Sequence, residues 1–152
     1  MNNIFDVNLL ESDFVALERF EKSKHLEDIF KLADSEKDIF DFLSFGPYKD
    51  INDFSSWIDL QNNQGDRITF AVYSKRLKKY VGNISITFIE ENYKKAEIGC
   101  VWYEKLAQKS EINRESVFLL LKYLLDTKMF ITSGDFLYHY DERFGYWENI
   151  GF

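Results

Sequence analysis

The sequence predicts a mixed α/β domain in which a mostly antiparallel sheet is flanked by helices. In three neighbouring segments, apolar and polar side chains alternate, as they do along strands that have one buried face. These segments cover residues 68–73, 80–89 and 96–103. Apolar residues recur at helical spacing on either side of them, in residues 24–34 and 113–128. The chain has 152 residues and no linker rich in Pro or Gly, so we expect one domain, 1–152.

The part of the chain before the predicted sheet is expected to be mainly helical. Residues 14–20 form a short strand, and Ser23 is placed to cap the helix that follows. A second short helical stretch, 39–45, ends at a Gly-Pro turn. Asn52 or Asp53 can cap a third helix.

The three alternating segments are joined by short turns, and only an antiparallel arrangement closes connections over so few residues. The polar loop that follows leads into the long helix, for which Asn113 is the predicted N-cap. The apolar stripe of this helix consists of Val117, Leu120, Leu121, Leu124 and Leu125. After it, residues 135–140 are predicted as a fifth strand, whereas residues 146–152 show no clear element.

The composition argues against a nucleic-acid partner. The chain has 26 acidic and 19 basic residues, a formal net charge of −7, so its surface should repel phosphates on average. No apolar stretch approaches the ~20 residues that span a bilayer, and the N-terminus lacks the pattern of a signal peptide. The single cysteine, Cys100, rules out an intrachain disulfide and fits a reducing compartment. We therefore expect a cytoplasmic protein with no nucleic-acid or membrane partner.

Five segments of the chain resemble, in order and with fitting gaps, the motifs of one enzyme superfamily. They are FLSFGPY at 42–48 followed by Phe54 and Trp57, FAVY at 70–73, VGNI at 81–84, EIG at 97–99, and LAQKS at 106–110 followed by Glu115. The superfamily is that of the GNAT N-acetyltransferases. The pattern is most similar to the ribosomal-protein N-acetyltransferase-like (RimJ/RimL-type) branch, over about residues 10 to 130.

The resemblance implies that the chain transfers an acetyl group from acetyl-CoA directly to a primary amine, either a protein N-terminus or a small molecule. It also implies a cofactor site where the third alternating strand meets the long helix. Main-chain groups there would bind the pantetheine arm and polarise the thioester carbonyl, and the loop at the helix start would bind the pyrophosphate. The cofactor-binding residues expected on this basis are Cys100, Val101, Trp102, Gln108, Lys109, Ser110, Ile112 and Asn113.

Glu97 is the candidate catalytic residue, as a base or as a group that orients water, because it would lie on a central strand near the cleft. Its carboxylate could equally pair with Lys94 or Lys95 in the preceding turn. Glu111 stands where better-known members have a glycine. Its charge would oppose pyrophosphate binding unless the side chain points away.

The remaining reactive side chains show no pattern of a nucleophile or a metal site. Cys100 is expected to be a small buried side chain, because cysteine within an alternating strand usually is one. His25 and His139 are far apart in the sequence and lack metal-ligand spacing. We expect His25 on the surface at a helix start.

The resemblance weakens after the long helix. Family members continue with a strand, a further helix and two closing strands, whereas here residues 144–147 are about one helical turn short and the chain then ends. We therefore expect a shortened domain with its C-terminal strands missing, whose open sheet edge could pair with a second copy. This leaves an alternative function, a catalytically inactive GNAT remnant that acts as a CoA-binding or protein-interaction module.

Overall fold

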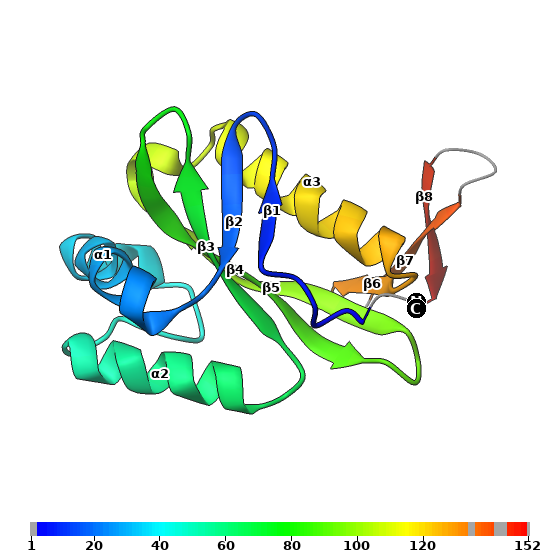
Figure 1. The fold of residues 1–152 in the computed structure, drawn as a ribbon, viewed down its shortest axis with the longest axis horizontal. Helices are drawn as coiled ribbons and strands as arrows, with labels where there is room; N and C mark the ends of the chain where they lie inside the picture. The colour runs from blue at the N-terminus through cyan, green and yellow to red at the C-terminus, as the bar shows by residue number, and fades with distance from the viewer. Residues whose placement is uncertain (1–2, 134–135, 142–145, 152) are drawn as a thin grey trace.

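The computed structural model describes residues 3–133, 136–141 and 146–151, with side chains described for residues 3–129. These residues form one sheet of eight strands in sequence order, flanked by helices (Figure 1). The strands are β1 (Leu9–Glu11), β2 (Val15–Arg19), β3 (Ile68–Ser74), β4 (Lys79–Glu90), β5 (Lys95–Tyr103), β6 (Phe130–Ser133), β7 (Phe136–Asp141) and β8 (Tyr146–Gly151). The helices are α1 (Lys22–Ser35), α2 (Ile51–Asn63) and α3 (Glu111–Asp126), with short 3-10 helices η1 (Lys37–Phe40) and η2 (Lys105–Ala107). Neighbouring strands are antiparallel except β5 and β6, so the predicted fold class is confirmed.

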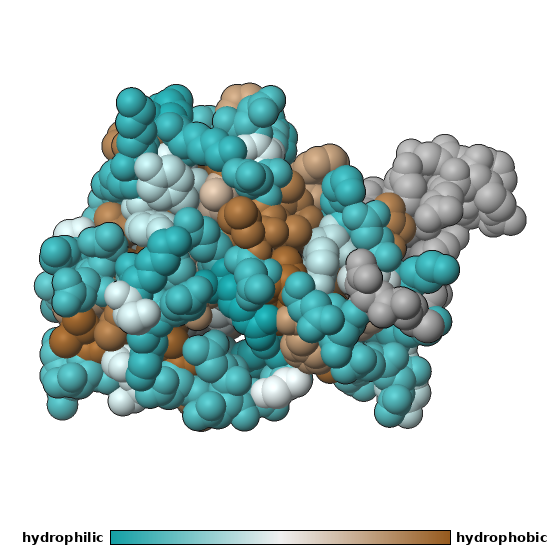
Figure 2. All heavy atoms as spheres, viewed as in Figure 1, coloured by the Kyte–Doolittle hydropathy of each residue, from teal (hydrophilic) through white to brown (hydrophobic). Residues whose placement is uncertain are grey.

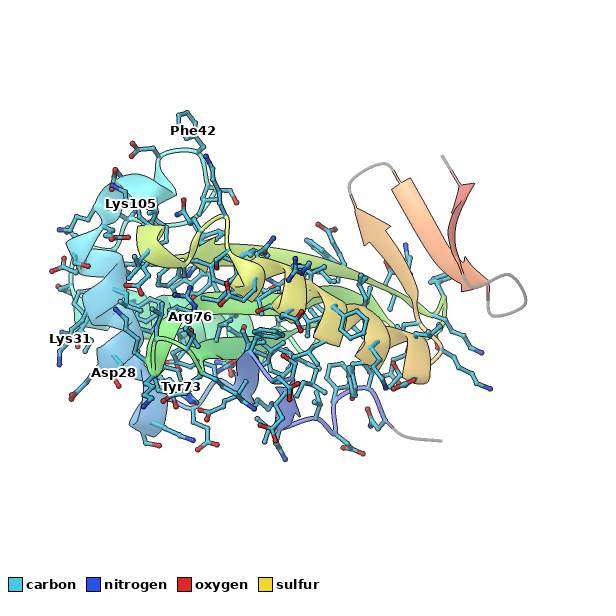
Figure 3. The ribbon with its side chains drawn as sticks, turned by 90° about the horizontal axis from the view of Figure 1, so that it is seen from above. Asp28, Lys31, Phe42, Tyr73, Arg76 and Lys105 are labelled. Atoms are coloured by element: carbon cyan, nitrogen blue, oxygen red, sulfur yellow. The ribbon has the colours of Figure 1, made fainter. Side chains whose placement is uncertain are left out.

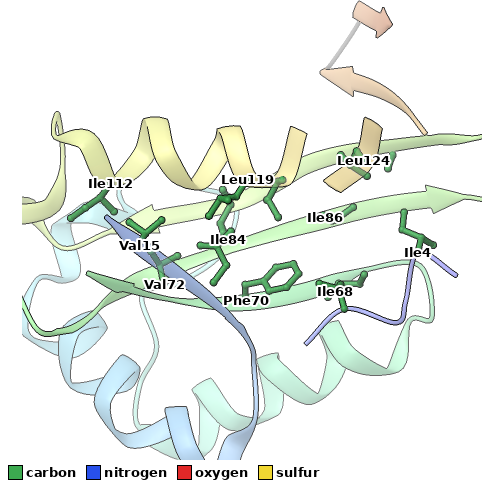
Figure 4. Close-up of a cluster of buried hydrophobic side chains, with 14 of the residues drawn as sticks. Ile4, Val15, Ile68, Phe70, Val72, Ile84, Ile86, Ile112, Leu119 and Leu124 are labelled. Carbon is green, nitrogen blue, oxygen red and sulfur yellow. The ribbon is translucent and has the colours of Figure 1, made fainter. Parts of the chain in front are cut away.

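Helices cover both faces of the sheet. α3 lies along one face, and α1 and α2 lie on the other (Figure 1). Under α3 the core is mainly aliphatic, with side chains such as Ile84 and Leu119 (Figure 4). Under α1 and α2 it is rich in aromatic rings, among them Phe54. Phe70 and Ala71 of β3 point into opposite cores, as expected for a strand that is buried on both faces.

Side chains just before α2 and α3 fix where these helices begin. Before α2 the Asp50 carboxylate accepts a hydrogen bond from the N–H of Asp53 at 2.8 Å. Before α3 the Ser110 hydroxyl oxygen accepts a hydrogen bond from the N–H of Ile112 at 3.2 Å. The predicted caps were two or three residues too far along the chain and lie inside the helices. Each helix starts where the first available side chain satisfies a free N–H group of its first turn.

His25 is buried, with 1% of its surface exposed, so the expectation of a surface histidine is wrong. Its Nδ1 accepts a hydrogen bond at 2.9 Å from the N–H of Glu21, the residue at which α1 is capped. Ser23, the predicted cap, lies inside α1, and at this helix start no side chain bonds an N–H of the first turn. Because Nδ1 is the acceptor, the ring proton is on Nε2.

The Glu18 carboxylate gathers several donors beside this histidine. Its Oε2 lies 2.7 Å from Nε2 of His25 and accepts a hydrogen bond from the Tyr80 hydroxyl at 2.5 Å. Lys24 forms an ion pair with the same oxygen at 3.1 Å. Burial alone would raise the pKa of Glu18, but the hydrogen bonds from Tyr80, His25 and Lys24 outweigh it and lower the pKa. This cluster ties β2, α1 and β4 together.

The alternation of β4 breaks near its end. Ile84 and Ile86 are fully buried and so are Asn83 and Ser85 on the other side of the strand, but Phe88 is 55% exposed. The register between β4 and β5 shifts between Thr87 and Glu90, and Phe88 has a φ of +49°. Both features mark a bulge, which changes the face on which the following side chains lie. The bulge makes the Phe88 ring available to a cavity described below.

The C-terminal part of the sheet differs from the prediction. Residues Phe130–Ser133, and not 135–140, supply the strand beside β5. The strand predicted over 135–140 corresponds to β7, which pairs with β6 on one side and with β8 on the other. No element was expected over residues 146–152, yet β8 lies there. The expected open edge on the 135–140 strand is therefore wrong, because β8 covers it.

On the face shown in Figure 2 hydrophilic side chains predominate, and hydrophobic ones gather between α1 and α2 and in the centre, between β1 and α3. Within the described ranges, the helices are all too short or too polar to cross a bilayer.

Candidate functional site

Strand β5 is paired on both sides at its start and on one side at its end. β5 pairs in parallel with β6 only from Lys95 to Glu97, opposite Phe130–Thr132. From Ile98 to Tyr103 it continues beside β4 without a partner strand on the β6 side among the described residues. Main-chain groups along this edge are therefore not used in pairing with another described strand, and a ligand can reach them.

A cavity of about 290 Å³ lies where this edge meets the start of α3, and we call it the β5–α3 cavity. Its lining residues are Ile39, Leu43, Val101, Trp102, Tyr103, Gln108, Lys109 and Asn113. Five of the eight predicted cofactor-binding residues are thus brought together. Ser110 lies beside them as the cap of α3, whereas the Ile112 side chain is fully buried in the core. Only the main chain of Ile112 could face a ligand, and its N–H is already bonded to Ser110.

The two carbonyl groups at the end of β5 face opposite ways. The Trp102 carbonyl faces β4, because a Cβ atom on Gly82 would lie 2.0 Å from its oxygen. The Tyr103 carbonyl accepts a hydrogen bond from Nε2 of Gln108 at 2.9 Å. Tyr103, which lies outside the five motifs, therefore presents its carbonyl to an amide donor on the side of the loop that leads to α3.

Arg76 holds the Glu111 carboxylate at the start of α3. Its Nε lies 2.8 Å from Oε1 of Glu111, and Figure 3 shows Arg76 close to the first turn of the helix. The hydrogen bond from Arg76 lowers the pKa of Glu111. The charge that was expected to oppose anion binding is thus paired with a cation from the β3–β4 turn. Lys109 lines the cavity and forms no ion pair with another described residue.

A second cavity, of about 330 Å³, lies further back along β5, and we call it the Glu97 cavity. Its lining residues are Ser44, Phe45, Trp57, Gln61, Arg67, Thr87, Phe88, Glu97, Gly99 and Cys100. The Glu97 carboxylate makes no hydrogen bond or ion pair with any described residue, and Lys95 instead pairs with Glu90 at 2.8 Å. The pairing of Glu97 with the lysines of the preceding turn is therefore not observed.

Cys100 sits in a bulge of β5 beside the Glu97 cavity. The register between β4 and β5 shifts between Asn83 and Ser85, and Cys100 has a φ of +50°, which is uncommon for a residue other than glycine. Burial raises the pKa of the Cys100 thiol, and this outweighs the nearby positive charge of Arg67. The thiol is therefore protonated at neutral pH. Cys100 is only partly buried and borders the cavity, so the expectation of a buried side chain is wrong.

The sequence motifs identified some cavity residues and missed others. Leu43, Phe45 and Trp57 belong to the motif that begins at residue 42, so its family resemblance was a signal for them. Phe42 itself is 99% exposed and points away from the rest of the chain (Figure 3). Phe88 had no such signal, because only the bulge in β4 places it at the cavity.

No family model and no curated sequence matches the chain, so the comparison with solved structures is the informative one. A probable acetyltransferase of the GNAT family from Chromobacterium violaceum is 24% identical, with a TM-score of 0.73 over 78% of this chain and 60% of that one. A GCN5-related N-acetyltransferase from Brucella melitensis is 22% identical, with a TM-score of 0.74 over 89% of this chain and 62% of that one.

A third structure, spermidine N-acetyltransferase from Vibrio cholerae in complex with CoA and spermine, is 16% identical. Its TM-score is 0.60, over 77% of this chain and 69% of that one. The chain spans 60% and 62% of the length of the first two structures. The strand order, the parting of β5 from β6 and these likenesses together show that the chain has the fold of the GNAT N-acetyltransferases.

Proposed function

We propose that the chain is an N-acetyltransferase that transfers the acetyl group of acetyl-CoA directly to a primary amine. The observation that carries the proposal is the meeting of the free β5 edge with the start of α3 around one cavity. Its similarity to structures of acetyltransferases, one of which contains CoA, supports the choice of cofactor. Assignment to the ribosomal-protein N-acetyltransferase-like branch, and a cytoplasmic location, are part of the same proposal.

The residues of the β5–α3 cavity fit the two kinds of group in this cofactor. Its pantetheine arm carries amides, and the main chain of β5 from Ile98 to Tyr103 has no partner strand on that side among the described residues to compete with them. Its phosphates need N–H donors and positive charge, which the first turn of α3 and Lys109 provide. Since Arg76 pairs with Glu111, no unpaired carboxylate opposes the phosphates there.

The main chain from Cys100 to Tyr103 would hold the pantetheine arm. Gln108, Lys109, Ser110 and Asn113 would hold the pyrophosphate, and Ile112 would contribute only by packing under the helix start. Acetyl-CoA, when bound, supplies an acetyl group activated as a thioester.

Glu97 is the proposed base. Its unpaired carboxylate borders the Glu97 cavity, beside the same strand whose later residues line the β5–α3 cavity. An amine reacts through its lone pair, so a proton must leave the ammonium form. A carboxylate at this place can accept that proton directly or through water. Cys100 has no part in the transfer, because its thiol is protonated and direct transfer needs no protein nucleophile.

Thermal unfolding with and without acetyl-CoA tests the cofactor site. At a concentration of 100 times Kd, a ligand that binds only the folded state stabilises it by about 2.7 kcal/mol. For a chain of this size the corresponding rise in Tm is roughly 5–10 °C. Lys109→Glu should weaken binding, whereas Lys31→Glu on α1 should not, because that exposed side chain lies on the opposite face of the sheet (Figure 3). Absence of a shift at millimolar acetyl-CoA would reject the proposal.

Release of the CoA thiol in the presence of amines tests the transfer itself. Glu97→Gln should lower kcat and leave the affinity for acetyl-CoA unchanged, because residue 97 borders the other cavity. Stabilisation by acetyl-CoA, with no release of the CoA thiol in the presence of any amine, would instead identify a CoA-binding remnant.

A further inference from the structure

The Glu97 cavity has aromatic walls. The rings of Phe45 and Trp57 are stacked, with centroids 5.3 Å apart and planes 28° apart. Phe88 forms a further wall and carries the Arg67 guanidinium over its ring at 5.4 Å. All three rings line the cavity, and none is fully buried. They therefore offer a ligand flat apolar surface.

The positive charge of Arg67 is already used within the protein. Its side chain is only 10% exposed, and its Nε lies 2.9 Å from a carboxylate oxygen of Asp66. Its NH1 donates a hydrogen bond to Oε1 of the Gln61 side-chain amide at 2.7 Å. Glu97 is thus the lining residue whose charge is left uncompensated among the described side chains. The cavity should attract a cation and disfavour a carboxylate.

The size and placement of the cavity limit the ligand further. A volume of about 330 Å³ lies at the lower end of the range for small-molecule sites. Glu97, Gly99 and Cys100 lie on β5, and the next residue of that strand, Val101, lines the β5–α3 cavity. Phe45 and Trp57 come from the segment that precedes α2 and from α2 itself, across from the strand. A ligand with its ammonium group at Glu97 would therefore direct its body toward these rings.

We propose that the acceptor is a small amine with one positive charge and an aromatic body, an arylalkylamine. Its ammonium group binds Glu97, and its ring packs against Phe45 and Trp57. The name "acceptor" rests on the function proposed above, but the ligand class rests on this cavity alone. The chemistry also excludes two other amine classes from tight binding. Polyamines lack a ring that could pack against Phe45 and Trp57. Amino acids carry a carboxylate, which the negative charge of Glu97 would repel.

Calorimetric titration of the full chain, with and without CoA, tests the ligand class directly. The probes are phenethylamine, n-butylamine, spermidine and L-phenylalanine at neutral pH. We expect phenethylamine to bind at least about tenfold more tightly than each of the others, because n-butylamine and spermidine have no ring to bury and Glu97 repels the carboxylate of L-phenylalanine. No saturable binding of phenethylamine, or equal binding of n-butylamine, spermidine or L-phenylalanine, overturns the proposal.

Variants locate the site. Trp57→Leu should weaken phenethylamine binding about tenfold or more. Phe45→Leu should weaken it as well, and it replaces Trp57→Leu in the test if that variant does not fold. Glu97→Gln, which keeps the shape, should weaken it severalfold, whereas Phe118→Leu, an exposed aromatic residue of α3, should leave it unchanged. Unchanged affinity in Glu97→Gln and in every folded ring variant overturns the proposal. Stabilisation by acetyl-CoA combined with the wrong order of amines refutes only the ligand class, whereas phenethylamine binding without any effect of acetyl-CoA refutes only the acetyltransferase function.

Discussion

Replacing Gly82 with alanine should damage the end of β5, where the candidate site lies. Gly82 is paired with Tyr103 across β4 and β5 and has a φ of +154°. A Cβ atom there would lie 2.0 Å from the Trp102 carbonyl oxygen and 2.8 Å from Cα of Tyr103. Both contacts are with main chain, so no side-chain rotation can relieve them. The strands must move apart at the very residues that border the β5–α3 cavity.

The expected loss has two parts. An alanine at this φ costs about 1–2 kcal/mol in backbone strain, and forcing a methyl group into packed structure costs about 1–3 kcal/mol more. Together they amount to a destabilisation of about 2–5 kcal/mol, which lowers Tm by roughly 4–20 °C in a chain of this size. Gly65→Ala is the matched control, because Gly65 has a φ of +73° but nothing within 4 Å of an added Cβ. It should lose only the backbone part, about 1–2 kcal/mol, or roughly 2–8 °C.

Thermal and urea unfolding of the two variants, followed by titration of the folded proteins with acetyl-CoA, measures both consequences. We expect Gly82→Ala to be the less stable variant and to bind acetyl-CoA more weakly than Gly65→Ala. Equal losses of Tm in the two variants would refute the close approach of β4 to β5 and the reasoning built on it.

Three further outcomes follow from the contacts described above. Arg76→Ala should raise the Kd for acetyl-CoA about threefold to tenfold, because Glu111 then faces the phosphates unpaired. In calorimetry, the double variant Arg76→Ala/Glu111→Gln should regain the original Kd. A double variant that binds as weakly as Arg76→Ala would count against this account. Ser110→Ala should lower the free energy of unfolding in urea by about 1 kcal/mol through loss of the α3 cap, and an unchanged value would mean that the cap is not used. Hydrogen bonds keep the pKa of Glu18 below its ordinary value despite burial, so its stabilisation is present above pH ~4.3 and is lost as the pH falls through the lowered pKa. The difference in the free energy of unfolding between the wild type and Glu18→Gln should therefore shrink in acid, and a difference that does not change with pH would contradict the stabilising role of these hydrogen bonds.

The boundaries of the elements show how far local patterns reach. The leucine spacing predicts the helix that becomes α3. It does not predict where the helix starts, because Asn113 and several other polar residues of the loop can each cap a helix. Ser110 is used because its hydroxyl also donates to the Ala107 carbonyl at 2.6 Å, which fixes the loop in front of the helix. The use of Ser110 as the cap therefore depends on η2, and no periodic pattern in the sequence predicts that short helix.

The candidate site shows the same limit. Val101, Gln108 and Asn113 line one cavity, as expected from the resemblance. They gave no hint that Arg76, 35 residues away, would neutralise Glu111. They also gave no hint that Phe88 would leave the core.

The sequence by itself determined the class of fold, the three-stranded meander and the helix that follows it, because each depends on a repeat that is read within a few residues. Only the tertiary structure decided how β5 parts from β6, which carboxylate is paired and which is free, and which rings face Glu97. Those features depend on bulges, on strand register and on contacts between residues far apart in the chain. A shift of one residue in any of them would place different side chains at the site.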